Sequence, residues 1–178
     1  DGAKPDTGRL MDTKDSAALL AACQRDVSAR FSVADSGPAP DFQRELMPFF
    51  ALRCDFGGCH LGTSSSSQLE LGEGCTFDVR TNLCSVDAGT QSAAVARQVY
   101  DNLLAPSITA PALHRVEPGQ VEQSFLLLKL SGCQDAFEAM TGCTPCGRPM
   151  PGGFTLRETD PDLFAMVVRW VSSGAPFE

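Results

Sequence analysis

The chain has 178 residues, of which 43% are hydrophobic, and its formal net charge is −8 with a pI near 4.7. Nucleic-acid binding needs a basic face, so we expect no nucleic-acid partner for a chain this acidic. No apolar run approaches the roughly 18 residues of a membrane-spanning helix, and we predict no membrane span. The length and composition fit one globular domain.

The N-terminal stretch, which begins "DGAKPDTGRLMD", is polar and rich in Gly, Pro and Asp. We predict a tail or tether over residues 1–13 and a single domain over 14–178. Such a stretch is typical of a frayed terminus, and it would also serve as the tether of a lipid-anchored protein.

Hydrophobic residues at helical spacing predict five helices. Asp41 can cap the second of them, Thr90 can cap the third, and Pro48 should kink or restart the second. Loops separate the helices, with one short strand candidate in "QLELG" over 68–72. The predicted helices cover residues 15–31, 41–53, 90–105, 120–132 and 162–171.

The last two helices carry the clearest end signals. Gly132 should close the fourth helix, because glycine favours the left-handed conformation that ends helices. Thr159 and Asp162 form a capping-box pattern before the last helix, and Pro161 suits its first turn. Gly174 should end that helix.

Eight cysteines are many for a cytosolic protein of this size, and the even count indicates disulfides and an oxidising compartment. We therefore predict a periplasmic or extracellular location. Only two histidines are present, so a multi-histidine metal centre is disfavoured. The cysteines are Cys23, Cys54, Cys59, Cys75, Cys84, Cys133, Cys143 and Cys146, and the histidines are His60 and His114.

The stretch "CDFGGCH" supplies the three side chains that covalent haem attachment needs. The thiols of Cys54 and Cys59 would add to the two vinyl groups, and the imidazole of His60 directly follows the second thiol. The common signature is C-x-x-C-H. Gly57 and Gly58 give the longer C-x4-C-H loop the backbone freedom it requires. The motif predicts one covalent haem c whose iron is bound by His60.

A low-spin electron-transfer haem needs a second axial ligand, which is commonly Met or His. Met150 is the preferred candidate because it lies between two prolines in "RPMPGG", where fixed φ angles can hold a thioether at one point. His114 is the competing candidate, and its other interpretation is a surface or hydrogen-bonding histidine. Met47 is too close in sequence to the motif, and Met166 is expected to pack in the core.

Disulfide formation is the alternative use of the motif. In a haemless protein, Cys54 and Cys59 would pair with each other, and His60 would be an incidental neighbour. The chain would then be a disulfide-stapled binding or surface-assembly module on the same helical scaffold.

The remaining cysteines also allow several interpretations. Cys75 and Cys84 are the preferred local pair, closing a loop. Cys143-x-x-Cys146 can be a zinc half-site or a redox dithiol, although disulfide pairing is favoured in an exported protein. Two disulfides are expected among the four cysteines that remain, and their pairing is open. These are Cys23, Cys133, Cys143 and Cys146.

Four stretches resemble the cytochrome c family, in particular the extracytoplasmic bacterial domains of planctomycete and myxobacterial type. They are the apolar segment leading into "CDFGGCHLG", then "RVEPGQVEQSFLLLKLSG", "CGRPMPGG" and "DLFAMVVRWVSSGAP", and together they span roughly residues 42–176. Most of that family has two residues between the motif cysteines, where this chain has four. Trp170 falls where the family packs an aromatic residue on its last helix.

The resemblance implies a mainly α, cytochrome-c-like domain with long disulfide-stapled loops. It implies an electron carrier rather than an enzyme, with haem attached through Cys54 and Cys59, His60 as the proximal iron ligand and Met150 as the distal one. The net negative charge adds the expectation of redox partner proteins with a basic docking surface.

Overall fold

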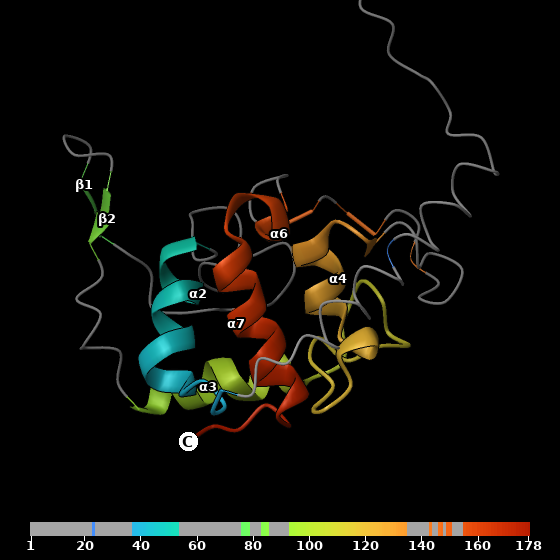
Figure 1. Cartoon of the computed structure of the whole chain (residues 1–178), viewed down its shortest axis with the longest axis horizontal. Coiled ribbons are helices and arrows are strands. Elements are labelled where there is room, and N and C mark those ends of the chain that lie inside the picture. The colour runs from blue at the N-terminus through green and yellow to red at the C-terminus, as the bar shows by residue number, and fades with distance from the viewer. Residues whose placement is uncertain are drawn as a thin grey trace, which may run out of the picture.

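The described part of the chain is mainly helical, as the sequence predicts, with one small two-stranded sheet (Figure 1). The structure is a computed structural model, and it describes residues 23, 37–53, 76–78, 83–85, 93–134, 143, 146–147, 149–150 and 155–178. No helix within these ranges is long and apolar enough to cross a membrane.

Several predicted segments lie outside the described residues. These are the tail over 1–13, the strand candidate over 68–72 and nearly all of the helix over 15–31, of which only Cys23 is described and is helical.

The second predicted helix forms in two parts. A π-helical turn, η1 (Phe42–Leu46), leads directly into α2 (Met47–Arg53). The change from π to α geometry comes one residue before Pro48. Proline has no N–H to donate to the preceding turn, so the helix restarts there, as the sequence predicts.

The start of η1 is capped reciprocally. The Asp41 carboxylate accepts a hydrogen bond of 2.8 Å from the N–H of Arg44, and the Glu45 carboxylate accepts one of 2.7 Å from the N–H of Asp41. Both donors would otherwise lack a partner within the helix. The predicted role of Asp41 is confirmed.

The third helix, α3 (Ala93–Leu104), begins three residues after Thr90, which lies outside the described residues. Val99 and Leu103 are buried on its inner face, and Val95 packs at the edge of the core, as the helical spacing predicts.

Two short strands precede α3 and were not predicted. β1 (Thr76–Asp78) and β2 (Leu83–Ser85) pair antiparallel, with Phe77 opposite Cys84. Three-residue strands carry too little alternation to stand out in a sequence pattern.

The fourth predicted helix, over 120–132, is interrupted at Ser124. A 3-10 turn, η2 (Val121–Gln123), comes first, and α4 (Phe125–Ser131) follows. Ser124 is extended, and its hydroxyl accepts a 2.9 Å hydrogen bond from the N–H of Glu117. A serine side chain that bonds to nearby backbone competes with the helical ladder, which explains the break. Gly132 ends α4 with φ 75°, in the predicted left-handed conformation.

The predicted cap of the last helix is wrong by one residue. Thr159 closes a short preceding helix, α6 (Leu156–Thr159), and its hydroxyl donates back within that helix. Asp160 caps α7 (Pro161–Ser172) instead, accepting a 3.2 Å hydrogen bond from the N–H of Leu163. Pro161 occupies the first position of α7, as predicted.

In Figure 1, α7 runs through the middle of the described helices, with α2 on one side, α4 on the other and α3 across one end. α7 also contacts α6 and η2, and α4 contacts α6. We call the large group of buried residues between these elements the main core. Its most buried members include Phe42, Leu46, Phe50, Leu103, Leu127, Leu130, Leu156, Phe164, Val167, Trp170 and Val171.

The C-terminal residues form hydrogen bonds and a ring contact with aromatic side chains at the main core. The indole N–H of Trp170 donates to the carbonyl of Pro176, and the Tyr100 hydroxyl donates to the carbonyl of Ala175, both over 2.9 Å. The ring of Phe177 lies 5.8 Å from that of Phe42 between centroids. These contacts hold the segment after α7 against η1 and α3.

Candidate functional site

The three residues of the C-x4-C-H motif, Cys54, Cys59 and His60, lie outside the described residues. The helix that leads to them is described: α2 ends at Arg53, directly before Cys54, and its Phe50 is fully buried. The motif therefore begins at the end of a helix that is anchored in the main core.

Met150, the predicted distal ligand, forms hydrogen bonds through both its backbone N–H and its backbone carbonyl. Its N–H donates to the carbonyl of Lys129 over 3.0 Å, and its carbonyl accepts from the N–H of Leu156 over 3.2 Å. Its half-buried side chain packs against the main core. The backbone of Met150 is thus fixed between the end of α4 and the start of α6. Met47, which precedes the C-x4-C-H motif in the sequence, is buried in the main core.

His114, the competing ligand, lies in a different setting. Its side chain is 46% exposed, and its Nδ1 lies 2.6 Å from a carboxylate oxygen of Glu117. Its carbonyl accepts a hydrogen bond from Phe125, at the start of α4. The neighbouring Arg115 is half-buried and donates to the carbonyl of Asn102, and desolvation lowers the pKa of its guanidinium from the usual value. His114 is a surface residue with a carboxylate partner.

A half-buried thioether at the edge of an apolar core, on a backbone held by two hydrogen bonds, fits the requirements of an axial iron ligand. The donor is soft, and water has limited access to it. Of the two predicted candidates, Met150 meets both conditions, whereas the imidazole of His114 is exposed and engaged by Glu117. The described residues therefore fit haem ligation through Met150 better than through His114.

Two disulfides are described, and both join cysteines of the four whose pairing the sequence leaves open. Cys143 pairs with Cys146, and Cys23 pairs with Cys133 across a sequence separation of 110. With both sulfurs of the C-x-x-C motif in a disulfide, the motif offers no thiolates to zinc. The predicted Cys75–Cys84 pair involves a residue outside the described ranges.

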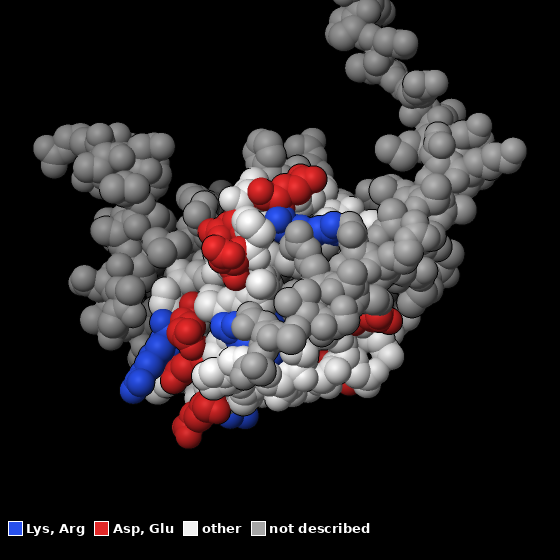
Figure 2. All heavy atoms as spheres, viewed as in Figure 1, with Lys and Arg blue, Asp and Glu red and all other residues white. Residues whose placement is uncertain are grey.

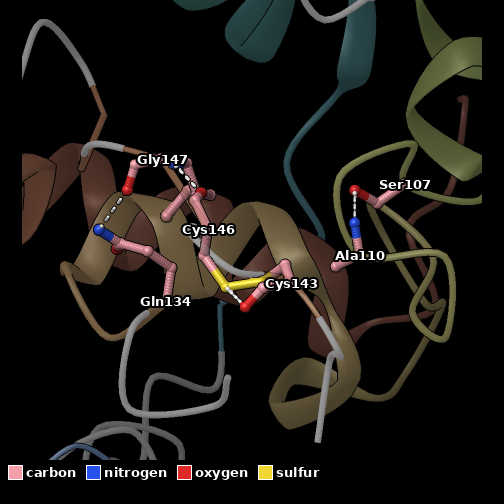
Figure 3. The surroundings of a disulfide bond; sticks show 7 residues. Ser107, Ala110, Gln134, Cys143, Cys146 and Gly147 are labelled. Carbon is pink, nitrogen blue, oxygen red and sulfur yellow. Dashed lines mark hydrogen bonds between the residues drawn. A yellow bond between two sulfur atoms is a disulfide. The ribbon is translucent and has the colours of Figure 1, made fainter. Parts of the chain in front are cut away.

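Both disulfides belong to one apolar group on the other side of α4, which we call the second cluster. The side chains of Phe125 and Leu128 bring α4 into it, and the loop around Ala110 closes it. The hydroxyl of Ser107 accepts from the N–H of Ala110 (Figure 3). The members of the second cluster are Cys23, Ala110, Leu113, Phe125, Leu128, Cys133, Cys143 and Cys146.

Two buried polar side chains next to the second cluster were not identified from the sequence. Lys129 is only 5% exposed, and its ammonium donates to the carbonyl of Cys146 over 2.8 Å. Gln134 is fully buried, and its amide donates to the carbonyl of Gly147 over 3.3 Å (Figure 3). The available signal was a lysine inside the apolar run "FLLLKL", where a charge requires a buried partner or a route to water.

No group of three or more His, Cys, Asp or Glu side chains in the described ranges is arranged to hold a metal ion.

No family model, curated protein or solved structure matches the chain. Its function therefore has to follow from its own residues.

The charged side chains do not gather by sign on the viewed face. Figure 2 shows acidic and basic side chains interspersed over that face. At the junction of α6 and α7, Glu158 and Asp162 are exposed and Asp160 is half-buried. At α3, Arg97 and Asp101 form an exposed pair of 3.1 Å. Such exposed pairs contribute little to stability.

Proposed function

We propose that the chain is an exported c-type electron carrier with one covalently attached haem. Cys54 and Cys59 form the thioether links, His60 is the proximal ligand and Met150 is the distal ligand. The observation that supports this proposal most directly is the placement of Met150, whose backbone is fixed from both sides and whose thioether borders the main core.

The packing of α2 and of Met150 against one core supports the same proposal. α2 packs in the main core and ends directly before Cys54, and Met150 packs against that core from the other end of the chain. A haem bound against this core would border apolar side chains. Burial of this kind excludes water and orients the cofactor.

In such a site the haem iron supplies the one-electron chemistry, and the chain sets its potential. The Met150 thioether would raise the reduction potential relative to a second histidine. Redox partners with a basic docking surface would suit the acidic chain.

Intact mass and the visible spectrum test the proposal directly. Protein exported from a host that attaches haem to c-type cytochromes should show the mass increment of one haem and a Soret band. Both should be lost in the Cys54→Ser, Cys59→Ser double variant, because no thiol remains for attachment. A colourless wild-type protein whose mass fits four disulfides would contradict the proposal.

Replacing Met150 with leucine tests the distal ligand while conserving side-chain volume. We expect the reduction potential to fall and the ligand-field spectrum to change, because leucine cannot ligate iron. Met166→Leu on α7 is the matched control, since Met166 also packs at the edge of the main core, and it should leave both measurements unchanged. An unchanged spectrum in Met150→Leu would move the assignment to His114 or to water.

The two described disulfides favour one second candidate, a haemless disulfide-stapled module for binding or surface assembly. They staple the second cluster through four buried cysteines. The mass measurement above separates this candidate from the electron carrier.

A further inference from the structure

A buried cation lies against the C-x-x-C disulfide. Lys129 Nζ donates to the carbonyl of Cys146 over 2.8 Å, and a Cβ placed on Gly147 would come within 3.1 Å of the same nitrogen. The ammonium is therefore packed on the backbone at the end of the motif. This carbonyl belongs to the same residue as the Cys146 sulfur, so the ammonium is bound to the residue that carries one of the two sulfurs.

This placement affects the two oxidation states of the motif differently. A disulfide is neutral, whereas a reduced cysteine can ionise, and a neighbouring lysine favours the thiolate. Cys146 is only 1% exposed. Exclusion of water disfavours an isolated thiolate and strengthens its attraction to a neighbouring ammonium, so the cation offsets a cost that burial imposes. A group that stabilises the reduced form makes a disulfide easier to reduce.

Gln134 is a second buried polar side chain beside the motif. Its amide nitrogen donates to Gly147, but its buried Oε1 has no hydrogen-bond partner among the described residues. Figure 3 shows this side chain in the surroundings of the disulfide. A disulfide has no hydrogen to donate, whereas reduction creates S–H groups. The acceptor in place for such a donor is the carbonyl of Cys143, which lies 3.5 Å from the Cys146 sulfur.

We propose that Cys143–Cys146 is a redox-active disulfide that accepts two electrons from thiol reductants, with Lys129 as a positioning residue that stabilises the reduced form. The S–S bond between Cys143 and Cys146 breaks, and two thiols of the reductant close into a disulfide. The reductant's two protons pass to the two sulfurs, or one passes to solvent when Cys146 remains a thiolate. This inference does not depend on the haem proposal.

The Cys23–Cys133 disulfide is an internal reference for this proposal. It lies in the same second cluster, and its cysteines are 7% and 1% exposed against 4% and 1% for Cys143 and Cys146. Both disulfides are thus equally withdrawn from solvent. The sulfurs of Cys133 and Cys146 each lie near a backbone carbonyl, that of Ser131 and that of Cys143, respectively. The two residues differ in that the carbonyl of Cys146 accepts a hydrogen bond from the Lys129 ammonium. A difference in reduction would therefore not come from burial.

The test equilibrates the protein in buffers of reduced and oxidised glutathione, quenches with acid, alkylates free thiols and maps the labelled peptides by mass spectrometry. The equilibrium depends on the squared concentration of reduced glutathione divided by the concentration of oxidised glutathione. We expect Cys143 and Cys146 to become labelled at a value of this quotient at least about tenfold lower than Cys23 and Cys133 require. Simultaneous reduction, or earlier reduction of Cys23–Cys133, would overturn the proposal.

Lys129 variants separate the effect of its charge from the geometry of the loop. Lys129→Met should move the midpoint of Cys143–Cys146 at least about tenfold toward more reducing conditions and leave that of Cys23–Cys133 in place. Lys129→Arg keeps the charge and should retain the wild-type midpoint. An unchanged midpoint in folded Lys129→Met would refute the role of the lysine. If Lys129→Met does not fold, the wild type and Lys129→Arg test the proposal. Both should reduce Cys143–Cys146 before Cys23–Cys133, and the opposite order in either protein would refute it.

Discussion

Replacing Trp170 with alanine is expected to lower the free energy of unfolding by about 3–5 kcal/mol. The side chain is fully buried in the main core, and its indole N–H donates to the carbonyl of Pro176. Its ring lies 5.4 Å from that of Phe42 and 6.4 Å from that of Tyr100 between centroids. Truncation removes these contacts, leaves a cavity and releases the C-terminal segment. Urea denaturation followed by circular dichroism measures the loss.

Two further variants test this explanation. Ile108→Ala removes the exposed side chain of a residue that is 56% accessible, and it should change stability by no more than about 0.5 kcal/mol. Trp170→Phe keeps an aromatic ring but loses the donor to Pro176, so its stability should lie between wild type and Trp170→Ala. A loss below about 1 kcal/mol in Trp170→Ala would mean that the main core does not depend on this ring.

Gly132→Ala is expected to lower the free energy of unfolding by about 2–5 kcal/mol, the second largest effect. Two costs add. The backbone has φ 75°, which costs a non-glycine residue about 1–2 kcal/mol, and the new Cβ would lie 2.5 Å from Cγ2 of Thr155. Forcing an extra methyl into a packed site typically costs about 1–3 kcal/mol. The same denaturation experiment applies.

The chain provides a matched control for the backbone cost. Gly119 has φ 76°, but nothing lies within 4 Å of a Cβ placed on it. Gly119→Ala should therefore lose only about 1–2 kcal/mol. Thr155→Ser removes the clashing methyl group, and in that background Gly132→Ala should cost no more than Gly119→Ala. Equal losses from the two single glycine variants would show that the contact with Thr155 carries no cost.

Local signals in the sequence predicted most of the described helices. Helical spacing indicated α3 and α7, and Asp41 and Gly132 were recognised as end signals because capping acts within one turn. Where two adjacent residues could cap, the sequence pattern selected Thr159, but Asp160 serves. The break at Ser124 depends on a hydrogen bond to Glu117, which comes into reach only once the preceding loop has folded back.

The candidate sites depended on different kinds of signal. The segment around Met150 was identifiable because its prolines and glycines are consecutive in the sequence. The contacts of Lys129 with Cys146 and of Gln134 with Gly147 join residues 17 and 13 positions apart, respectively, and no local pattern indicates them. The spacing of Cys23, Cys133, Cys143 and Cys146 left three pairings open. The pairing follows from which of these cysteines the fold brings together in the second cluster.

The Cys23–Cys133 disulfide makes the chain between these two residues a covalent ring. η1, α2, α3 and α4 lie on that ring, whereas α6 and α7 lie on the segment after it. A protease that cuts one peptide bond between residues 23 and 133 therefore opens the ring without releasing a fragment. The two pieces stay joined until a reductant acts, so a nicked molecule keeps its full mass on a non-reducing gel and separates only on a reducing one.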